Sequence, residues 1–209
     1  MPNWCYTNIT IYHEDKVKLE DFFKHIQTWS SHTYKPNGFD KFSLGWLGNI
    51  IGNSGLAEWK KKADGSEDFE PWISCRGSLQ SLDFNNGYIN ISTETAWSPM
   101  LEMWKLLCDK YLPEADIIFT AEEPGNCLYQ SNNPYVIGKY CIDVWETPND
   151  FKEAESIWEA TEEETRAFLQ RALKTDETDI KKLINMSSEV IDDAWFSVNE
   201  WEECDISVY

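Results

Sequence analysis

The chain has few basic residues and no long apolar run, and both absences exclude classes of protein. Its 18 Lys and Arg stand against 37 Asp and Glu, which gives a formal net charge of −19 at pH 7. A surface of this sign repels nucleic-acid phosphates and anionic membranes. The sequence shows no membrane span, and its first residues lack the basic and apolar regions of a signal peptide. We therefore expect a cytoplasmic protein that binds neither nucleic acid nor a membrane directly.

Closely spaced cysteines and histidines are also absent. The six cysteines are scattered between residues 5 and 204, and the three histidines have no metal-binding spacing. In a reducing compartment such cysteines act mostly as small buried hydrophobic residues rather than as disulfide partners or zinc ligands. The glycines between residues 45 and 55 match neither the dinucleotide fingerprint nor a P-loop. The sequence therefore predicts no cofactor, no metal ion and no catalytic residue.

Aromatic residues, in contrast, are plentiful, and acidic residues are unevenly distributed. The 209 residues include 11 Trp, 9 Tyr and 10 Phe, which supply enough apolar area for a large core. Residues 1–120 hold 16 acids and 11 bases, whereas residues 121–209 hold 21 acids and 7 bases, a net charge of −14. We expect a folded core over residues 1–130, followed by an acidic extension over residues 131–209 that packs on it.

The stretch from Gly87 to Gly125 predicts a strand, a helix and a second strand. Residues 88–96 alternate between two faces with the period of a half-buried strand. Ser98 is expected to cap the helix, and Pro99 suits its first position because no amide proton is needed there. Apolar residues then recur at helical spacing until Pro113, which ends the helix.

The second strand of this stretch covers Ile117 to Phe119. Trp97 follows the first strand and Glu123 follows the second. Since a helix separates the two strands, we expect these residues to leave opposite ends of parallel strands, so that they need not be neighbours.

The preceding residues add a strand, a helix and a further strand. Trp4 to Tyr12 alternates as a strand, and Asp15 is suited to cap the helix that follows. Trp72 to Phe84 reads as a strand whose apolar parity changes, which predicts a bulge near Gln80–Ser81. Asn86–Gly87 then favours a tight hairpin turn. The resulting order is βαββαβ, an α+β fold with an antiparallel sheet and its helices on one face.

Other segments carry weaker signals. Ser43 is expected to cap a short helix, and Lys60 to Glu70 is expected to be a mobile polar loop. In the extension we expect a strand over residues 136–145, helices opening at Thr147, at Thr161 and at Thr178 or Asp179, and an edge strand over residues 204–209.

Three motifs of the first part resemble those of a known family. Met1-Pro2-Asn3-Trp4-Cys5, Thr95-Ala96-Trp97-Ser98-Pro99 and Glu122-Glu123-Pro124-Gly125 are similar to motifs of the YubB-type ferredoxin-like domain family of phages, conjugative plasmids and bacteria. The resemblance covers roughly residues 1–130 and implies a ferredoxin-like fold in a protein of phage or mobile-element origin. It implies no iron–sulfur cluster and no settled activity. This chain has Arg76-Gly77-Ser78-Leu79-Gln80 where many members carry Trp-Gly-Thr-Lys-Trp.

Six residues of the first part form the predicted binding set: Asn3, Trp4, Arg76, Trp97, Glu122 and Glu123. Glu122 and Glu123 are adjacent, so only one of them can face a given cleft, and a structural acid in the Pro-Gly turn is the competing interpretation. Arg76 is suited to bind an anion or to form an ion pair with Glu123. Trp4 and Trp97 are suited to stack on a ligand, although core packing is the more common role at such junctions.

The acidic extension supplies a second candidate surface, composed of Glu162, Glu163, Asp176, Glu177, Asp192 and Asp193. We expect a non-enzymatic binding protein whose acids occupy the basic surface of a partner, such as a host defence or DNA-handling protein. The alternatives are a small-molecule binder or hydrolase with a pocket near Arg76, Trp97 and Glu123, and a subunit-interaction module. The competing interpretation of the acidity is that it serves solubility alone.

Overall fold

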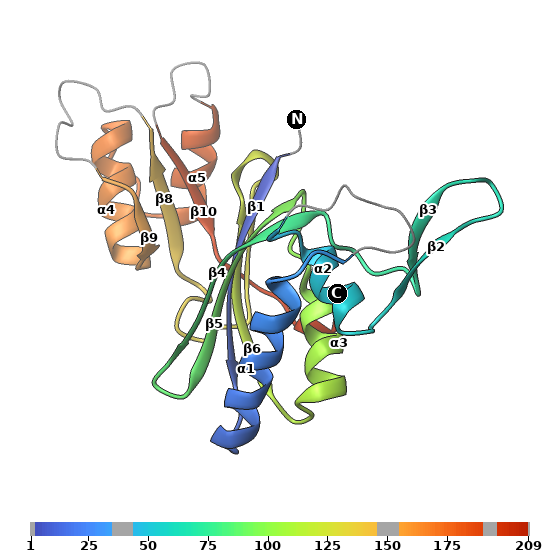
Figure 1. Cartoon of the computed structure of the whole chain (residues 1–209). Coiled ribbons are helices and arrows are strands. Elements are labelled where there is room, and N and C mark those ends of the chain that lie inside the picture. The colour runs from blue at the N-terminus through green and yellow to red at the C-terminus, as the bar shows by residue number, and fades with distance from the viewer. Residues whose placement is uncertain (1–2, 35–43, 146–154, 190–195, 209) are drawn as a thin grey trace. The chain divides into compact units, whose positions relative to one another are not determined.

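A computed structural model describes residues 3–34, 44–145, 155–189 and 196–208 (Figure 1). The fold is mixed α+β, with several sheets and five α-helices among the described residues. The chain divides into two compact units. Unit 1 comprises Met1–Leu128 and Cys204–Tyr209, and unit 2 comprises Tyr129–Glu203.

Four strands of unit 1 pair in the order β6-β1-β5-β4, and every pair is antiparallel. They are β1 (Trp4–Tyr12), β4 (Gly77–Asn85), β5 (Tyr88–Ala96) and β6 (Asp116–Glu123). The bounds of β1 and β5 are those predicted from alternation. The predicted strand over Ile117–Phe119 lies inside β6 and pairs with β1, with Ile9 opposite Phe119.

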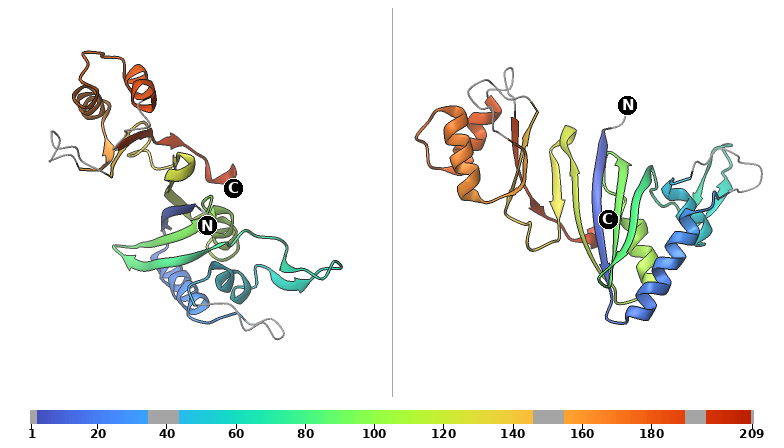
Figure 2. Two further views of the ribbon diagram at one scale, coloured as in Figure 1. Left: turned by 90° about the horizontal axis from the view of Figure 1, so that it is seen from above. Right: turned by 60° about the vertical axis from the view of Figure 1, so that its left-hand side comes forward.

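One face of this sheet is buried because the central strands β1 and β5 alternate over nearly their whole length. Cys5, Thr7, Ile9 and Ile11 are buried in β1, while the residues between them are more exposed. The α-helices α1 (Lys16–Ser30) and α3 (Leu101–Tyr111) cover that face (Figure 2). The largest fully buried side chain, Trp104, belongs to α3.

The predicted helix starts have different outcomes. Asp15 caps α1 as predicted, since its carboxylate accepts from the backbone N–H groups of Val17 and Lys18 at 3.0 and 3.2 Å. The predicted cap at Ser98 is wrong: α3 begins at Leu101 after Met100, with no side-chain cap. The helix starts later than predicted because the Thr95 hydroxyl donates a hydrogen bond to the Ser98 carbonyl oxygen at 2.8 Å, which keeps Ser98 outside the helix.

Strand β4 shows the predicted bulge and is shorter than predicted. Its register with β5 shifts between Leu79 and Ser81, which leaves Gln80 as the extra residue. The strand begins at Gly77, not at Trp72. The turn to β5 is also as predicted: Asn86 and Gly87 both have positive φ, at 52° and 77°, as a two-residue hairpin turn requires.

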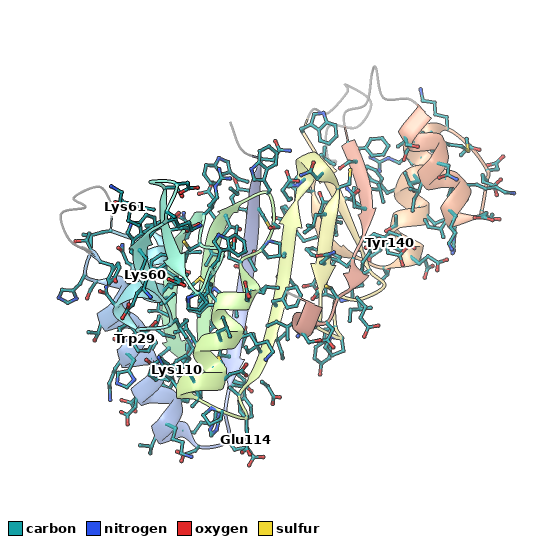
Figure 3. The ribbon with its side chains drawn as sticks, turned by 90° about the vertical axis from the view of Figure 1, so that its right-hand side faces the viewer. Trp29, Lys60, Lys61, Lys110, Glu114 and Tyr140 are labelled. Atoms are coloured by element: carbon teal, nitrogen blue, oxygen red, sulfur yellow. The ribbon has the colours of Figure 1, made fainter. Side chains whose placement is uncertain are left out.

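The predicted polar loop over Lys60–Glu70 is wrong. The strands β2 (Glu58–Lys61) and β3 (Glu67–Glu70) form an antiparallel hairpin, on which Figure 3 labels Lys60 and Lys61. Trp59 meets Phe69 edge to face across this hairpin, with ring centroids 5.1 Å apart, and this contact holds the two strands together. The short α2 (Leu47–Asn53) follows Trp46 at its N-cap, and Ser43, the predicted cap, lies outside the described residues.

Unit 2 contains two helices and a small sheet. The antiparallel sheet has the order β10-β8-β9, formed by Phe196–Glu200, Tyr140–Val144 and Ile157–Ala160. The helices α4 (Glu162–Leu173) and α5 (Ile180–Glu189) pack against each other and against this sheet. β7 (Leu128–Ser131) and β11 (Glu202–Glu203) pair in parallel.

Several predictions fall within these elements. The capping box of Thr161 and Glu164 at α4 is confirmed, and Asp179 accepts from Lys181 N–H ahead of α5. The helix predicted to begin at Thr147 is wrong at its C-terminal end, because Ile157 lies in strand β9. Its first residues lie outside the described part of the chain.

The last described residues belong to unit 1. The predicted edge strand over residues 204–209 is wrong, because Ile206–Val208 form a 3₁₀ helix, η4. Cys204 and Ile206 pack against the core between α3 and the sheet.

The capping box predicts a defined response to acid. Hydrogen bonds from the backbone N–H and the hydroxyl of Thr161 lower the pKa of Glu164 below its ordinary value of 4.5. The carboxylate therefore stabilises the folded state fully above the ordinary pKa of 4.5, and this stabilisation is lost as the pH falls through the lower pKa of the folded state. Glu164→Gln is therefore expected to be less stable than the wild type near pH 7, with a difference that closes toward about pH 3.

Thermal unfolding followed by circular dichroism between these two pH values tests this expectation. Glu163→Gln is the matched control, because it removes the same charge from the same helical turn and leaves the capping carboxylate of Glu164 in place. An equal pH-dependent difference in both variants would contradict the prediction.

Candidate functional site

The strand register gathers the predicted binding residues at one end of the unit 1 sheet. β5 and β6 both run antiparallel to β1, so they are parallel to each other, and both end beside the start of β1. Trp97 follows β5, and Glu123 is the last residue of β6. The expectation that these two residues leave opposite ends is therefore wrong. Two parallel strands joined by a helix end on the same side.

Asn3 lies between these two strand ends. Its carbonyl oxygen accepts a hydrogen bond from the Trp97 backbone N–H at 2.9 Å. On the other side it lies against Gly125, where a Cβ would come within 2.5 Å of Asn3 Nδ2 and within 2.8 Å of Glu123 Oε1. The absence of a side chain at residue 125 thus lets the Asn3 carboxamide and the Glu123 carboxylate approach each other.

Glu123 is a buried carboxylate that is only partly satisfied. Its side chain is 1% exposed. Oε1 accepts from the Gly125 backbone N–H at 3.0 Å, so the predicted structural role in the turn is confirmed. Oε2 is buried, and no described residue forms a hydrogen bond with it. Glu122 is the less buried of the two and lies on the other face of β6, as expected for adjacent strand residues.

Two buried polar residues outside the predicted binding set lie on the neighbouring strands. Cys5 and Thr95 are paired residues on β1 and β5, and both are completely buried. Burial, with smaller contributions from the nearby carboxylates of Glu123 and Glu122, raises the pKa of the Cys5 thiol to about 11. At neutral pH Cys5 is therefore a neutral thiol and not an activated nucleophile.

The two tryptophans of the set are exposed, so the core-packing interpretation is wrong for both. Trp4 is 43% exposed and Trp97 is 47% exposed. Trp97 also has φ +74°, in the left-handed region that bulky residues rarely adopt. Such conformations are concentrated at functional sites, where the surrounding structure compensates for their strain.

Arg76 lies at the same end of the sheet but away from Glu123. Its carbonyl oxygen accepts from the Ala96 backbone N–H at 2.8 Å, which places it beside the end of β5. β5 and β1 lie between Arg76 and β6, a separation of about 14 Å at the usual strand spacing. Among the described residues Arg76 and Glu123 form no ion pair, so that predicted pairing is wrong, and the exposed Arg76 side chain faces solvent.

Two surface depressions lie away from this end of the sheet. One, of about 470 Å³, is lined by Tyr12, His13, Glu14, Asp15, Glu114 and Asp116. Another, of about 260 Å³, lies between α3 and the start of β6. Figure 3 labels Glu114 in the turn between α3 and β6. Neither depression contains a residue of the predicted binding set. In the described ranges no three His, Cys, Asp or Glu side chains are arranged to hold a metal ion.

The predicted acidic residues of unit 2 do not form a single cluster. Glu162 and Glu163 are exposed in the first turn of α4, whereas Asp176 and Glu177 follow its last turn. Ten helical residues, Glu164–Leu173, lie between these pairs and span about 15 Å. Glu162 forms an ion pair with Arg166, and Glu177 accepts from the backbone N–H groups that precede α5. Asp192 and Asp193 lie outside the described residues. Over the described part of the chain, no helix has the length and apolar character needed to span a membrane.

The burial of the cysteines predicts their reactivity. All six are free thiols, and Cys127 is exposed while Cys5, Cys75 and Cys108 are buried. Burial raises the pKa of Cys75 and of Cys108 to about 12. In the folded protein near pH 8 we expect a thiol reagent to modify Cys127 at least tenfold faster than Cys5, Cys75 and Cys108. Peptide mass mapping after short labelling measures this ratio, and comparable modification of Cys5 would contradict it.

The unsatisfied carboxylate predicts a stabilising substitution. Glu123→Gln keeps an acceptor for Gly125 N–H and replaces a buried charge by a neutral amide, which is cheaper to bury. We expect the free energy of unfolding to rise by about 1 kcal/mol or more, which corresponds to roughly 3 °C in Tm. Asp83→Asn, at an exposed strand position, is the control and is expected to leave Tm unchanged. A lower Tm for Glu123→Gln would show that the carboxylate is satisfied in the folded protein.

Comparison of the chain with protein-family models, with curated proteins and with solved structures gives no match.

Proposed function

We propose that this chain is a non-enzymatic binding protein whose acidic unit 2 engages a basic surface of another protein. The observation that carries the proposal is the charge of unit 2, where residues 129–203 hold 18 acids and 7 bases. Carboxylates at Glu163 and Asp176 are exposed, and neither forms an ion pair with a described residue. Their charges are therefore available to a cationic partner.

The spacing of these acids favours an extended partner. The acidic pairs at the two ends of α4 are separated by about 15 Å of helix, so no single lysine or arginine can meet both. A protein groove that binds nucleic acid presents cations over such distances, because the phosphates it contacts are regularly spaced. A host DNA-handling or defence protein has this kind of surface, and the proposal is that unit 2 occupies it and inhibits it.

Unit 1 is proposed to be a ferredoxin-like scaffold. The strand order β6-β1-β5-β4, with α1 and α3 on one face, supports this assignment. The resemblance of three motifs to the YubB-type family supports a phage or mobile-element origin within the same proposal. The acidic surface repels nucleic acid, which favours a protein partner over direct nucleic-acid binding.

Charge reversal in unit 2 tests the proposal. The double variant Glu163→Lys with Asp176→Lys is expected to reduce capture of basic proteins from a host lysate at least fivefold at about 50 mM salt. Wild-type capture is expected to fall strongly at about 300 mM salt, because exposed charges are screened. The captured proteins are identified and quantified by mass spectrometry.

A matched control uses two exposed acids of unit 1. Glu14→Lys with Asp83→Lys changes the net charge by the same amount, and both positions are exposed. Equal loss of capture in the two double variants would show a general effect of net charge and would contradict a binding surface on unit 2.

A further inference from the structure

The end of the unit 1 sheet holds a carboxylate oxygen that lacks a hydrogen-bonding partner within the described structure. It is Oε2 of Glu123, which is buried. Beside this carboxylate lies Asn3, which is half-buried and whose carbonyl oxygen accepts from the Trp97 backbone N–H. Both groups lie against Gly125. Buried polar groups are nearly always paired, so an unpaired carboxylate indicates a missing donor.

The chemistry of the missing donor follows from the carboxylate. Glu123 forms no ion pair with a described Lys, Arg or His, so its negative charge has no nearby cation. A buried anion is stabilised best by a cation that also donates hydrogen bonds. Ammonium and guanidinium groups meet both requirements. The Asn3 carboxamide oxygen provides a second acceptor for such a group.

Trp97 provides the third component. Its ring is 47% exposed, and its backbone is tied to Asn3 by a single hydrogen bond of 2.9 Å. Indole is the aromatic ring on which ammonium and guanidinium groups bind most strongly. The strained φ of +74° places this exposed ring immediately after β5, next to the residue that lies against Gly125.

We propose that Asn3, Trp97 and Glu123 form a binding site for an ammonium or guanidinium group. Glu123 Oε2 and the Asn3 carboxamide oxygen accept its hydrogen bonds, and the ring of Trp97 packs against it. The group belongs either to a free small molecule or to a lysine or arginine side chain of a protein. This site lies in unit 1 and is independent of the function proposed for the acids of unit 2.

Titration of the full chain with blocked single groups tests the site. N-acetyl-arginine amide and butylamine are the cationic probes, and N-acetyl-citrulline amide is the neutral analogue of the first. Binding is followed by NMR at the backbone amide resonances of Gly125 and Trp97. We expect saturable shifts with the cationic probes and at least tenfold weaker binding of the citrulline probe. Equal binding of the arginine and citrulline probes, or no shift at about 10 mM of either cation, would overturn the proposal.

Two variants locate the binding. Glu123→Gln is expected to weaken binding of the arginine probe at least tenfold while Tm does not fall. Asp83→Asn removes one negative charge at an exposed position of β4, outside the proposed site, and is expected to change the affinity less than twofold. Equal weakening in both variants would show that the probe is attracted only by the net negative charge of the protein, and it would overturn the proposed site. Comparison with a neutral peptide containing one arginine distinguishes the sources: tighter binding of the peptide indicates a protein side chain, and equal binding indicates a small molecule.

Discussion

The antiparallel pairing of β1 with strands on both of its sides constrains the rest of unit 1. Because β5 and β6 each oppose β1, they share a direction, and their last residues meet at the first residue of β1. This places Asn3, Trp97 and Glu123 together although they are far apart in the chain. The same end of the sheet then departs from ordinary packing, with a buried acid that is partly unpaired and an exposed tryptophan in a left-handed conformation. Departures of this kind are typical of sites where stability has been given up for binding.

Much of the unit 1 sheet can be predicted from the sequence because its central strands alternate over nearly their whole length. Residues 4–12 and 88–96 are each buried on one face, so alternation marks their ends accurately. The start of α3 could not be predicted in this way. Ser98 and Pro99 are good helix-start residues, but the Thr95 hydroxyl binds the Ser98 carbonyl oxygen and the helix begins only after Met100. The hairpin over residues 58–70 is stabilised by contacts between aromatic rings that lie ten or more residues apart, and local patterns do not show these.

Only part of the candidate site could be predicted from the sequence. Asn3, Trp97 and Glu123 all stand in the sequence motifs. The rule that parallel strands joined by a helix end on the same side correctly predicts that Trp97 and Glu123 lie at one end of the sheet. The close approach of Asn3 to Gly125 depends on the exact register of β1 against its neighbours, which sequence alone does not give. The separation of Arg76 from Glu123 likewise follows from the strand order, because two whole strands lie between them.

The residues that follow unit 2 return to unit 1, where Ile206 packs against the core near α3. Unit 2 is therefore an insertion into the chain of unit 1, not a tail attached to it. During synthesis on the ribosome, unit 1 lacks this closing segment until all of unit 2 has been translated. The apolar surface that Ile206 covers in the folded protein therefore stays exposed in the nascent unit 1 while about seventy-five further residues are added.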